Sequence, residues 1–179
     1  MKLNRAITSA LLIAAVTGLC VAQGGPASPP AQTSIDIGGK KITIKYSAPS
    51  MRGRQIFGPG GLISKDPTYP VWRAGANSAT ALHTDADLMI GSLAVPKGDY
   101  TLFVATDSNP WKLIVSKETG QWGLSYHADK DLGRVPMMVT KPAAPIETYK
   151  MTLSPTGGNK GKLTLEWENV VAAVDFTAK

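Results

Sequence analysis

Side chains that could do chemistry are concentrated in residues 69–80. Trp72, Arg73, Asn77 and Thr80 lie there, in a sequence with little helix or strand periodicity. An arginine presents a rigid fork of donors, and an asparagine amide both donates and accepts hydrogen bonds. The stretch therefore suits a carboxylate, a phosphate or a sugar. The alternative is a structural loop, in which Arg73 and Asn77 satisfy backbone groups and Trp72 fills the core.

Two further features could extend such a site. Arg52 and Arg54 lie in a turn with Gly53, where they could add positive charge to the same cleft or stay solvated. Trp122 lies outside any clean alternation, so it could form an exposed aromatic platform for a sugar ring. Packing in the core is the alternative for Trp122.

Two histidine triplets have a spacing that could suit a metal ion: His83, Asp85 and Asp87, and His127, Asp129 and Asp131. In an extended strand, residues two apart share a face, so each triplet could offer an imidazole and two carboxylates to zinc or iron. Asp-x-Asp is also common turn chemistry, and a turn would scatter these side chains. The turn interpretation is favoured, and no metal or other cofactor is expected.

The sequence contains no His-Glu-x-x-His, Gly-x-Ser-x-Gly or phosphate-loop motif. No pair of carboxylates stands out for glycoside hydrolysis. These absences favour a non-enzymatic protein that binds a small polar ligand, a glycan or an envelope component. A hydrolase or isomerase that uses His83 or His127 is the alternative, and a purely structural envelope protein is a third.

The elements that must position these residues are strands. Ile35 and Ile37 precede Gly38-Gly39, and Ile42 and Ile44 follow, which predicts a hairpin. No segment keeps a period of 3.6. Alternation predicts further strands at residues 80–84, 88–90, 93–95, 100–106, 111–115, 134–140, 146–153, 163–167 and 170–176. The pattern indicates an all-β fold, a single antiparallel β-sandwich or jelly-roll-like domain with a long irregular loop at residues 50–72.

The N-terminus is typical of a secretory signal. Lys2 and Arg5 precede a short apolar run, and small residues precede Gln23, so we expect cleavage after Ala22 and a periplasmic or secreted protein. The apolar run is too short to span a bilayer, so no transmembrane anchor is expected in the mature form. Lipidation at Cys20 is disfavoured because a large leucine precedes it.

The predicted organisation is a signal at residues 1–22, a flexible leader at 23–33 and one β-sandwich domain at 34–179. The formal net charge is +6, and this excess is spread along the chain. No basic stripe interleaved with aromatic residues is present, so nucleic acid is not an expected partner. The oligomeric state is left open.

Five segments carry a resemblance to a known family: residues 52–58, 71–77, 96–103, 121–123 and 163–168. On these landmarks, residues 46–176 resemble the exported bacterial family catalogued as domain of unknown function 2911. The resemblance implies a β-rich exported domain, and it assigns no particular activity because the family has none that can be carried over. The chain departs from the family at Ser78, where the family usually has glutamate, and in the inserted residues 64–67. Ser78 therefore argues against acid–base chemistry in this loop.

Overall fold

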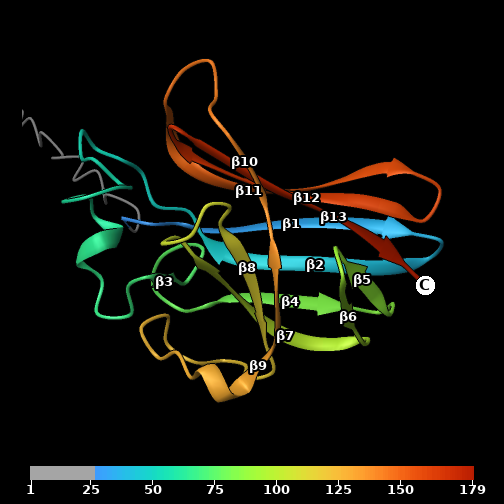
Figure 1. The fold of residues 1–179 in the computed structure, drawn as a ribbon. Helices are drawn as coiled ribbons and strands as arrows, with labels where there is room; N and C mark the ends of the chain where they lie inside the picture. Colours follow the sequence, from blue (N-terminus) through green and yellow to red (C-terminus); the bar gives the residue numbers. More distant parts are fainter. Residues whose placement is uncertain (1–26) are drawn as a thin grey trace, which may run out of the picture.

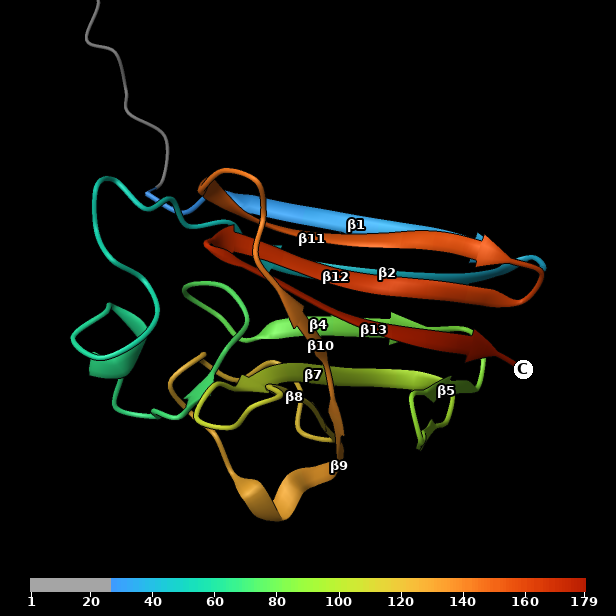
Figure 2. The same ribbon diagram turned by 45° about the horizontal axis from the view of Figure 1, so that its top comes forward.

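The computed structural model describes residues 27–179, which form two antiparallel sheets packed against each other (Figure 1, Figure 2). In the first sheet the strand order is β1-β2-β4-β7-β8-β9, and β3 also pairs with β7. Its strands are β1 (Pro30–Ile37), β2 (Lys40–Ser47), β3 (Val71–Trp72), β4 (Thr80–Thr84), β7 (Gly98–Ala105), β8 (Lys112–Ser116) and β9 (Asp131–Pro136).

In the second sheet the order is β11-β12-β13-β5-β6, and β10 also pairs with β13. Its strands are β5 (Leu88–Ile90), β6 (Leu93–Val95), β10 (Met138–Thr140), β11 (Ile146–Gly157), β12 (Lys160–Glu168) and β13 (Val170–Ala178). The predicted all-β sandwich is confirmed. The expected signal at residues 1–22, with Cys20, lies outside the described residues.

The β1–β2 hairpin shows how local sequence sets a register. Gly38 and Gly39 have φ angles of 61° and 77°, the left-handed backbone that a two-residue type I′ turn requires at both positions. Ile37 therefore pairs with Lys40, as the hairpin prediction requires. Because β1 begins at Pro30, residues 30–33 are strand rather than part of the flexible leader expected from the sequence.

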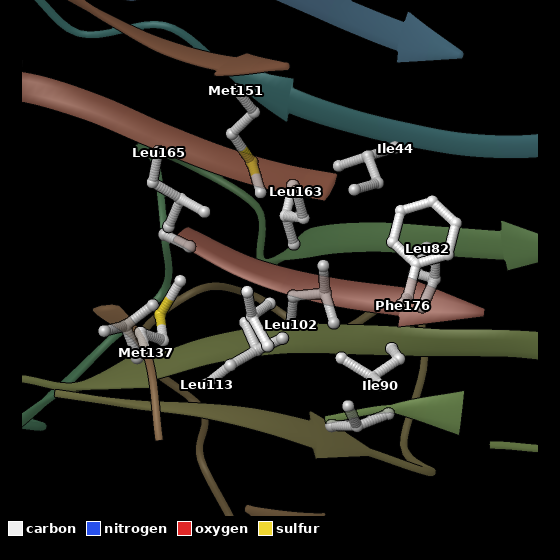
Figure 3. Close-up of a cluster of buried hydrophobic side chains, with 14 of the residues drawn as sticks. Ile44, Leu82, Ile90, Leu102, Leu113, Met137, Met151, Leu163, Leu165 and Phe176 are labelled. Carbon is white, nitrogen blue, oxygen red and sulfur yellow. The ribbon is translucent and has the colours of Figure 1, made fainter. Parts of the chain in front are cut away.

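The core lies between the two sheets and follows the alternation of the strands. On β4, residues 80, 82 and 84 are buried and residues 81 and 83 are exposed. Leu82, Leu102 and Leu113 of the first sheet face Leu163 and Leu165 of the second (Figure 3). A buried leucine contributes roughly 1.5–3 kcal/mol of hydrophobic stabilisation, so this layer holds the sheets together.

The chain crosses between the sheets at Met137. The sequence predicted one strand at residues 134–140, whereas the structure divides it into β9 in the first sheet and β10 in the second. Met137 at the crossing is 1% exposed, and its N–H donates to the carbonyl of Trp111 at 2.8 Å. Alternation alone could not reveal the crossing because both halves keep an extended backbone.

The outer face of the first sheet is partly covered by the β8–β9 connection. Phe103 and Ile114 point outward and are buried in a second apolar cluster, against which Tyr126 of the connection packs. The ring centroids of Phe103 and Tyr126 are 5.1 Å apart. The connection contains η2 (Ala128–Lys130). It leaves a groove on the outer face over β2, β4 and β7.

A long irregular segment, residues 48–70, precedes β3 and contains only η1 (Ile63–Lys65) and an isolated bridge from Ser50 to Thr148. This confirms the predicted irregular loop. Figure 1 shows it as the teal and green excursion at one end of the sandwich. No helix within residues 27–179 has the length and hydrophobicity to cross a membrane.

Candidate functional site

Trp72 lies in the core rather than in a cleft. Its side chain is 1% exposed, and its ring centroid lies 5.8 Å from that of Trp167 and 5.0 Å from that of Tyr149. The indole Nε1 donates to the carbonyl of Gly75 at 3.1 Å. Trp72 therefore has almost no surface to offer a ligand and ties the loop to the core.

The two neighbouring polar candidates also have internal partners. Thr80 is fully buried, and its Oγ1 donates to the carbonyl of Ala74 at 2.8 Å. Arg73 pairs with Asp66 through Nη2 at 2.9 Å, and its side chain is 13% exposed. The backbone of Gly123 lies so close to Arg73 that a Cβ there would collide with the arginine side chain. These contacts favour the structural interpretation of the loop.

Asn77, Arg54 and Trp122 are exposed. Asn77 has a φ of 60° and accepts the N–H of Gly123 through its backbone carbonyl at 3.1 Å. Arg54 donates to the carbonyls of Met51 and Ser50 at 2.9 and 2.8 Å. Trp122 is 54% exposed and stays available as an aromatic platform. The structure therefore does not gather the predicted loop residues around one cleft.

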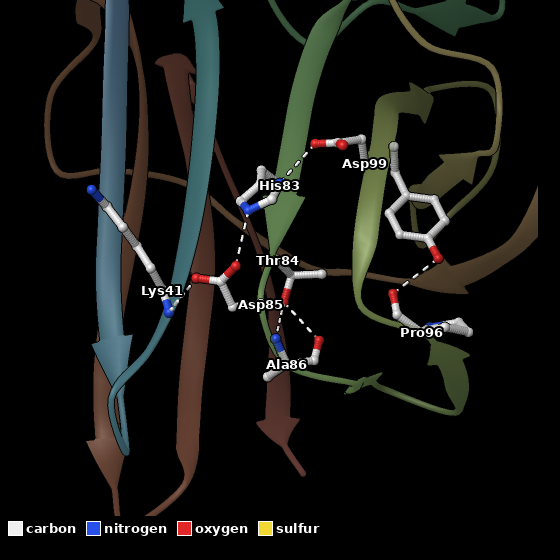
Figure 4. Close-up of polar contacts among 8 residues, drawn as sticks. Lys41, His83, Thr84, Asp85, Ala86, Pro96 and Asp99 are labelled. Carbon is white, nitrogen blue, oxygen red and sulfur yellow. Dashed lines mark hydrogen bonds and ion pairs between the residues drawn. The ribbon is translucent and has the colours of Figure 1, made fainter.

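His83 stands between two carboxylates on the outer face of the first sheet (Figure 4). Its Nδ1 lies 2.7 Å from Oδ1 of Asp99, and its Nε2 lies 3.1 Å from Oδ1 of Asp85. Asp85 also accepts the backbone N–H of Lys41 at 3.2 Å. The antiparallel pairing of β4 with β7 creates the first contact, because it sets His83 opposite Asp99.

The two carboxylates favour the charged imidazolium. The hydrogen bond with Asp99, followed by that with Asp85, raises the pKa of His83 above its ordinary value of 6.5. The hydrogen bond with His83, followed by that with the N–H of Lys41, lowers the pKa of Asp85. An imidazolium has no free ring lone pair, so His83 in this state neither accepts a proton nor ligates a metal.

The remaining triplet residues are dispersed. Asp87 accepts the N–H of Lys97 at 2.8 Å, and His127 bonds Glu118 at 2.8 Å. Asp129 pairs with Lys130, and Asp131 accepts bonds from Tyr126 and Arg134. In the first triplet only the side chains of His83 and Asp85 are in contact. In the second triplet no two of the three side chains bond each other. Over residues 27–179, no group of three or more His, Cys, Asp or Glu residues could hold a metal ion.

A groove of about 280 Å³ lies beside His83, over β2, β4 and β7. Ala81 contributes to its lining, opposite Lys45 on β2 and Thr101 on β7. Because alanine is small, the outer face of the sheet is hollow between these longer neighbours. The hollow is therefore a direct consequence of one small residue at an outward position of the central strand.

Polar groups of several kinds surround the hollow. Thr43 and Asp99 flank His83 across the sheet, and Thr119 of the β8–β9 connection also lines the groove. Within residues 27–179, Lys45 has no ion pair, and the hydroxyls of Thr43 and Thr119 have no hydrogen-bond partner. The groove thus combines an ammonium group, hydroxyls and a carboxylate that can reach a ligand.

Two important residues were missed by the sequence interpretation. Neither Asp99, which directly precedes the strand predicted at residues 100–106, nor Lys45 was singled out as a candidate. The alternation of β2 was a usable signal for Lys45, since it predicts that Thr43 and Lys45 point away from the core side of Ile42 and Ile44. No local signal pairs Asp99 with His83.

The family was identified by comparison with known proteins. A family model described as a protein of unknown function, DUF2911, matches residues 28–176. Searches of curated proteins and of solved structures found no match.

Proposed function

The chain belongs to the DUF2911 family, and we propose that this member is a non-enzymatic binding protein for a small polar ligand that carries an acidic group. The groove beside His83 would be the binding site. The observation that carries the proposal is the ammonium group of Lys45, which has no ion pair within residues 27–179, beside a hollow floored by Ala81 in a groove of about 280 Å³. That volume is close to the lower end of typical ligand pockets, roughly 300 Å³, which suits a molecule the size of one sugar ring.

The ammonium group of Lys45 is the charge that supports an anionic ligand. The positive charge favoured on His83 is more than offset by Asp85 and Asp99, which bond its two ring nitrogens. Lys45 is the remaining cation that lines the groove. A ligand carboxylate would pair with Lys45, and ligand hydroxyls would bond Thr43 and Thr119, since a hydroxyl both donates and accepts. A hydroxy acid or a sugar acid has this combination of groups.

The state of His83 supports binding rather than catalysis. A general base needs a free lone pair within reach of the proton that it removes. Both ring nitrogens of His83 instead face carboxylates at 2.7 and 3.1 Å. His127, the other candidate base, bonds Glu118 on the β8–β9 connection and does not line this groove.

A calorimetric titration with galacturonate and with the neutral sugar galactose tests the proposal. We expect galacturonate to bind and galactose to bind more weakly. Lys45→Met should weaken galacturonate binding about tenfold or more, because a hydrogen bond to a charged group is worth roughly 1.5–3 kcal/mol.

Ala81→Leu should abolish binding by filling the hollow. Its matched control is Ala94→Leu, an exposed alanine of β6 in the other sheet, which should leave binding unchanged. Equal binding of both sugars, or full binding by the Ala81→Leu variant, would contradict the assignment of this groove. If neither sugar binds, the proposed class of ligand, a sugar acid or hydroxy acid, is wrong.

Trp122 gives the proposal an extension to larger glycans. Trp122 comes shortly after Thr119 in the sequence of the β8–β9 connection, and its side chain is 54% exposed. An aromatic face of this kind stacks on a sugar ring through its apolar side. Trp122→Ala should weaken the binding of an oligogalacturonide and leave the binding of monomeric galacturonate unaffected. If the wild type and the variant bind the oligomer with equal affinity, Trp122 is not part of the binding site.

A further inference from the structure

A second cavity, of about 400 Å³, lies at the end of the sandwich where the irregular segment meets the β7–β8 connection. Phe57, Ser64 and Tyr69 line it from the irregular segment, and Thr106, Asp107 and Trp111 line it from the connection. It shares no lining residue with the groove beside His83. A ligand here would therefore be independent of the function proposed above.

The aromatic wall of this cavity is fixed by the core. The ring centroid of Phe57 lies 4.9 Å from that of Trp111 and 5.6 Å from that of Trp72. The N–H of Phe57 donates to Oε2 of Glu168 at 3.1 Å, and Glu168 is only 7% exposed. Because these contacts hold the ring in place, a ligand would meet a wall that is already formed.

Most of the side-chain groups in the cavity wall that remain free to bond a ligand are hydrogen-bond acceptors. Ser64 donates its hydroxyl hydrogen to the carbonyl of Gly61 at 2.8 Å, and Thr106 donates its own to the carbonyl of Pro70 at 3.2 Å. Both hydroxyl oxygens keep lone pairs for a ligand donor. Asp107 is exposed and has no ion pair or hydrogen bond in the part of the chain that the structure describes.

The charge of the cavity differs in sign from that of the chain. Among residues 27–179, no lysine, arginine or histidine lines it, although the chain has a formal net charge of +6. An anionic ligand would find no cation here. A cation would find the Asp107 carboxylate together with aromatic rings, whose negative faces attract positive charge within about 6 Å.

We propose that this cavity binds an organic cation with an ammonium group, which is held by the carboxylate of Asp107 and by the rings of Tyr69 and Trp111. Phe57 closes the inner wall behind the ligand. The hydroxyl oxygens of Ser64 and Thr106 accept the ligand's remaining donors. The size of the cavity, about 400 Å³, admits a cation such as choline without rearrangement of the wall.

The test compares choline with 3,3-dimethyl-1-butanol, its uncharged analogue of nearly identical shape. Titration by NMR should show choline binding about tenfold more tightly than the alcohol, since cation–π attraction and the carboxylate act on the charged ligand alone. The indole signal of Trp111 should move on addition of choline. Asp107→Asn and Tyr69→Leu should each weaken choline binding several-fold.

Two controls separate this site from other effects. Asp175→Asn changes an exposed carboxylate on the second sheet, and Lys45→Met changes the first groove; neither should alter choline binding. Asp107 is exposed, so its variant should keep the thermal midpoint of the wild type. Equal binding of choline and the alcohol, no binding of choline, or full binding by Asp107→Asn would each overturn the proposal.

Discussion

Two tryptophans illustrate how little residue type says about role. Trp72 is enclosed by aromatic neighbours, whereas Trp122 is 54% exposed and forms an isolated bridge to Ser78. Both occur in stretches where apolar and polar residues do not alternate cleanly, so both were candidates for ligand binding from the sequence alone. Burial separates them: Trp72 stabilises the fold, and Trp122 is free to meet a ligand.

Substitution of the two tryptophans should therefore have opposite effects on stability. Trp72→Ala should lower the free energy of unfolding by roughly 3–5 kcal/mol, because it removes a large buried side chain. Trp122→Ala should change it by no more than about 0.5 kcal/mol. Urea denaturation of both variants measures the difference. A stable Trp72→Ala protein would contradict the structural interpretation of the loop.

The ionisation of His83 should report its two carboxylate partners. An NMR titration should give His83 a midpoint above 6.5, and Asp99→Asn should lower it by removing the largest cause of the shift. The stabilisation from this pairing is complete below pH 6.5, the ordinary value, and is lost as the pH rises through the raised pKa of the folded protein. A midpoint at or below 6.5 would contradict the imidazolium and reopen the role of His83 as a base.

At the scale of elements, the irregular segment is held by a residue from the other end of the chain. Glu168 has a φ of 51°, is buried, and accepts the N–H groups of Ile56 and Phe57 at 2.9 and 3.1 Å. A segment without regular secondary structure must find such partners for its backbone donors. The sequence places Glu168 between the strands predicted at residues 163–167 and 170–176, but it could not show where the carboxylate points.

Glu168→Ala should loosen this segment. The buried N–H of Ile56 and the partly buried N–H of Phe57 lose their acceptor, at a cost of roughly 1–3 kcal/mol in unfolding free energy. Hydrogen exchange should accelerate at Ile56 and Phe57, and the cavity for the organic cation should lose its fixed wall. Glu166→Ala, on the same strand but with its side chain partly exposed, is the control. Equal exchange rates at Ile56 in the two variants would contradict the role of Glu168 in holding this segment.

Strand positions could be predicted from sequence because the period of two is a local property. The hairpin at Gly38-Gly39 and the strands around β4 and β12 were confirmed for this reason. The groove could not be predicted, since it depends on β2, β4 and β7 lying side by side. Between β4 and β7 the chain leaves for the second sheet as β5 and β6, so no sequence spacing brings His83 to Asp99.

At the scale of the whole molecule, the two packed sheets carry side chains of different chemistry at two places. The groove on the outer face presents Lys45, and the cavity at the end of the sandwich presents Asp107; neither has an ion pair among the residues that the structure describes. Sites of this kind suit a protein that captures small molecules. Outward-facing strand residues and connections supply most of the lining of both places, and binding residues commonly lie on such connections.

Export is a further prediction at this scale. The sequence predicts cleavage after Ala22, so the intact mass of the protein secreted by its host should correspond to a chain that begins at Gln23. Fractionation should place it in the periplasm or the medium. A mass that includes residues 1–22, or a lipid attached at Cys20, would contradict this prediction.

The most direct test of the central proposal is a map of backbone amide shifts in an NMR spectrum during titration with galacturonate. The proposal predicts that the largest changes gather on Thr43, Lys45, Ala81 and Thr119, the lining of the groove, and disappear in the Ala81→Leu variant. Changes confined to the second sheet, or changes that persist in the Ala81→Leu variant, would show that the groove is not the binding site.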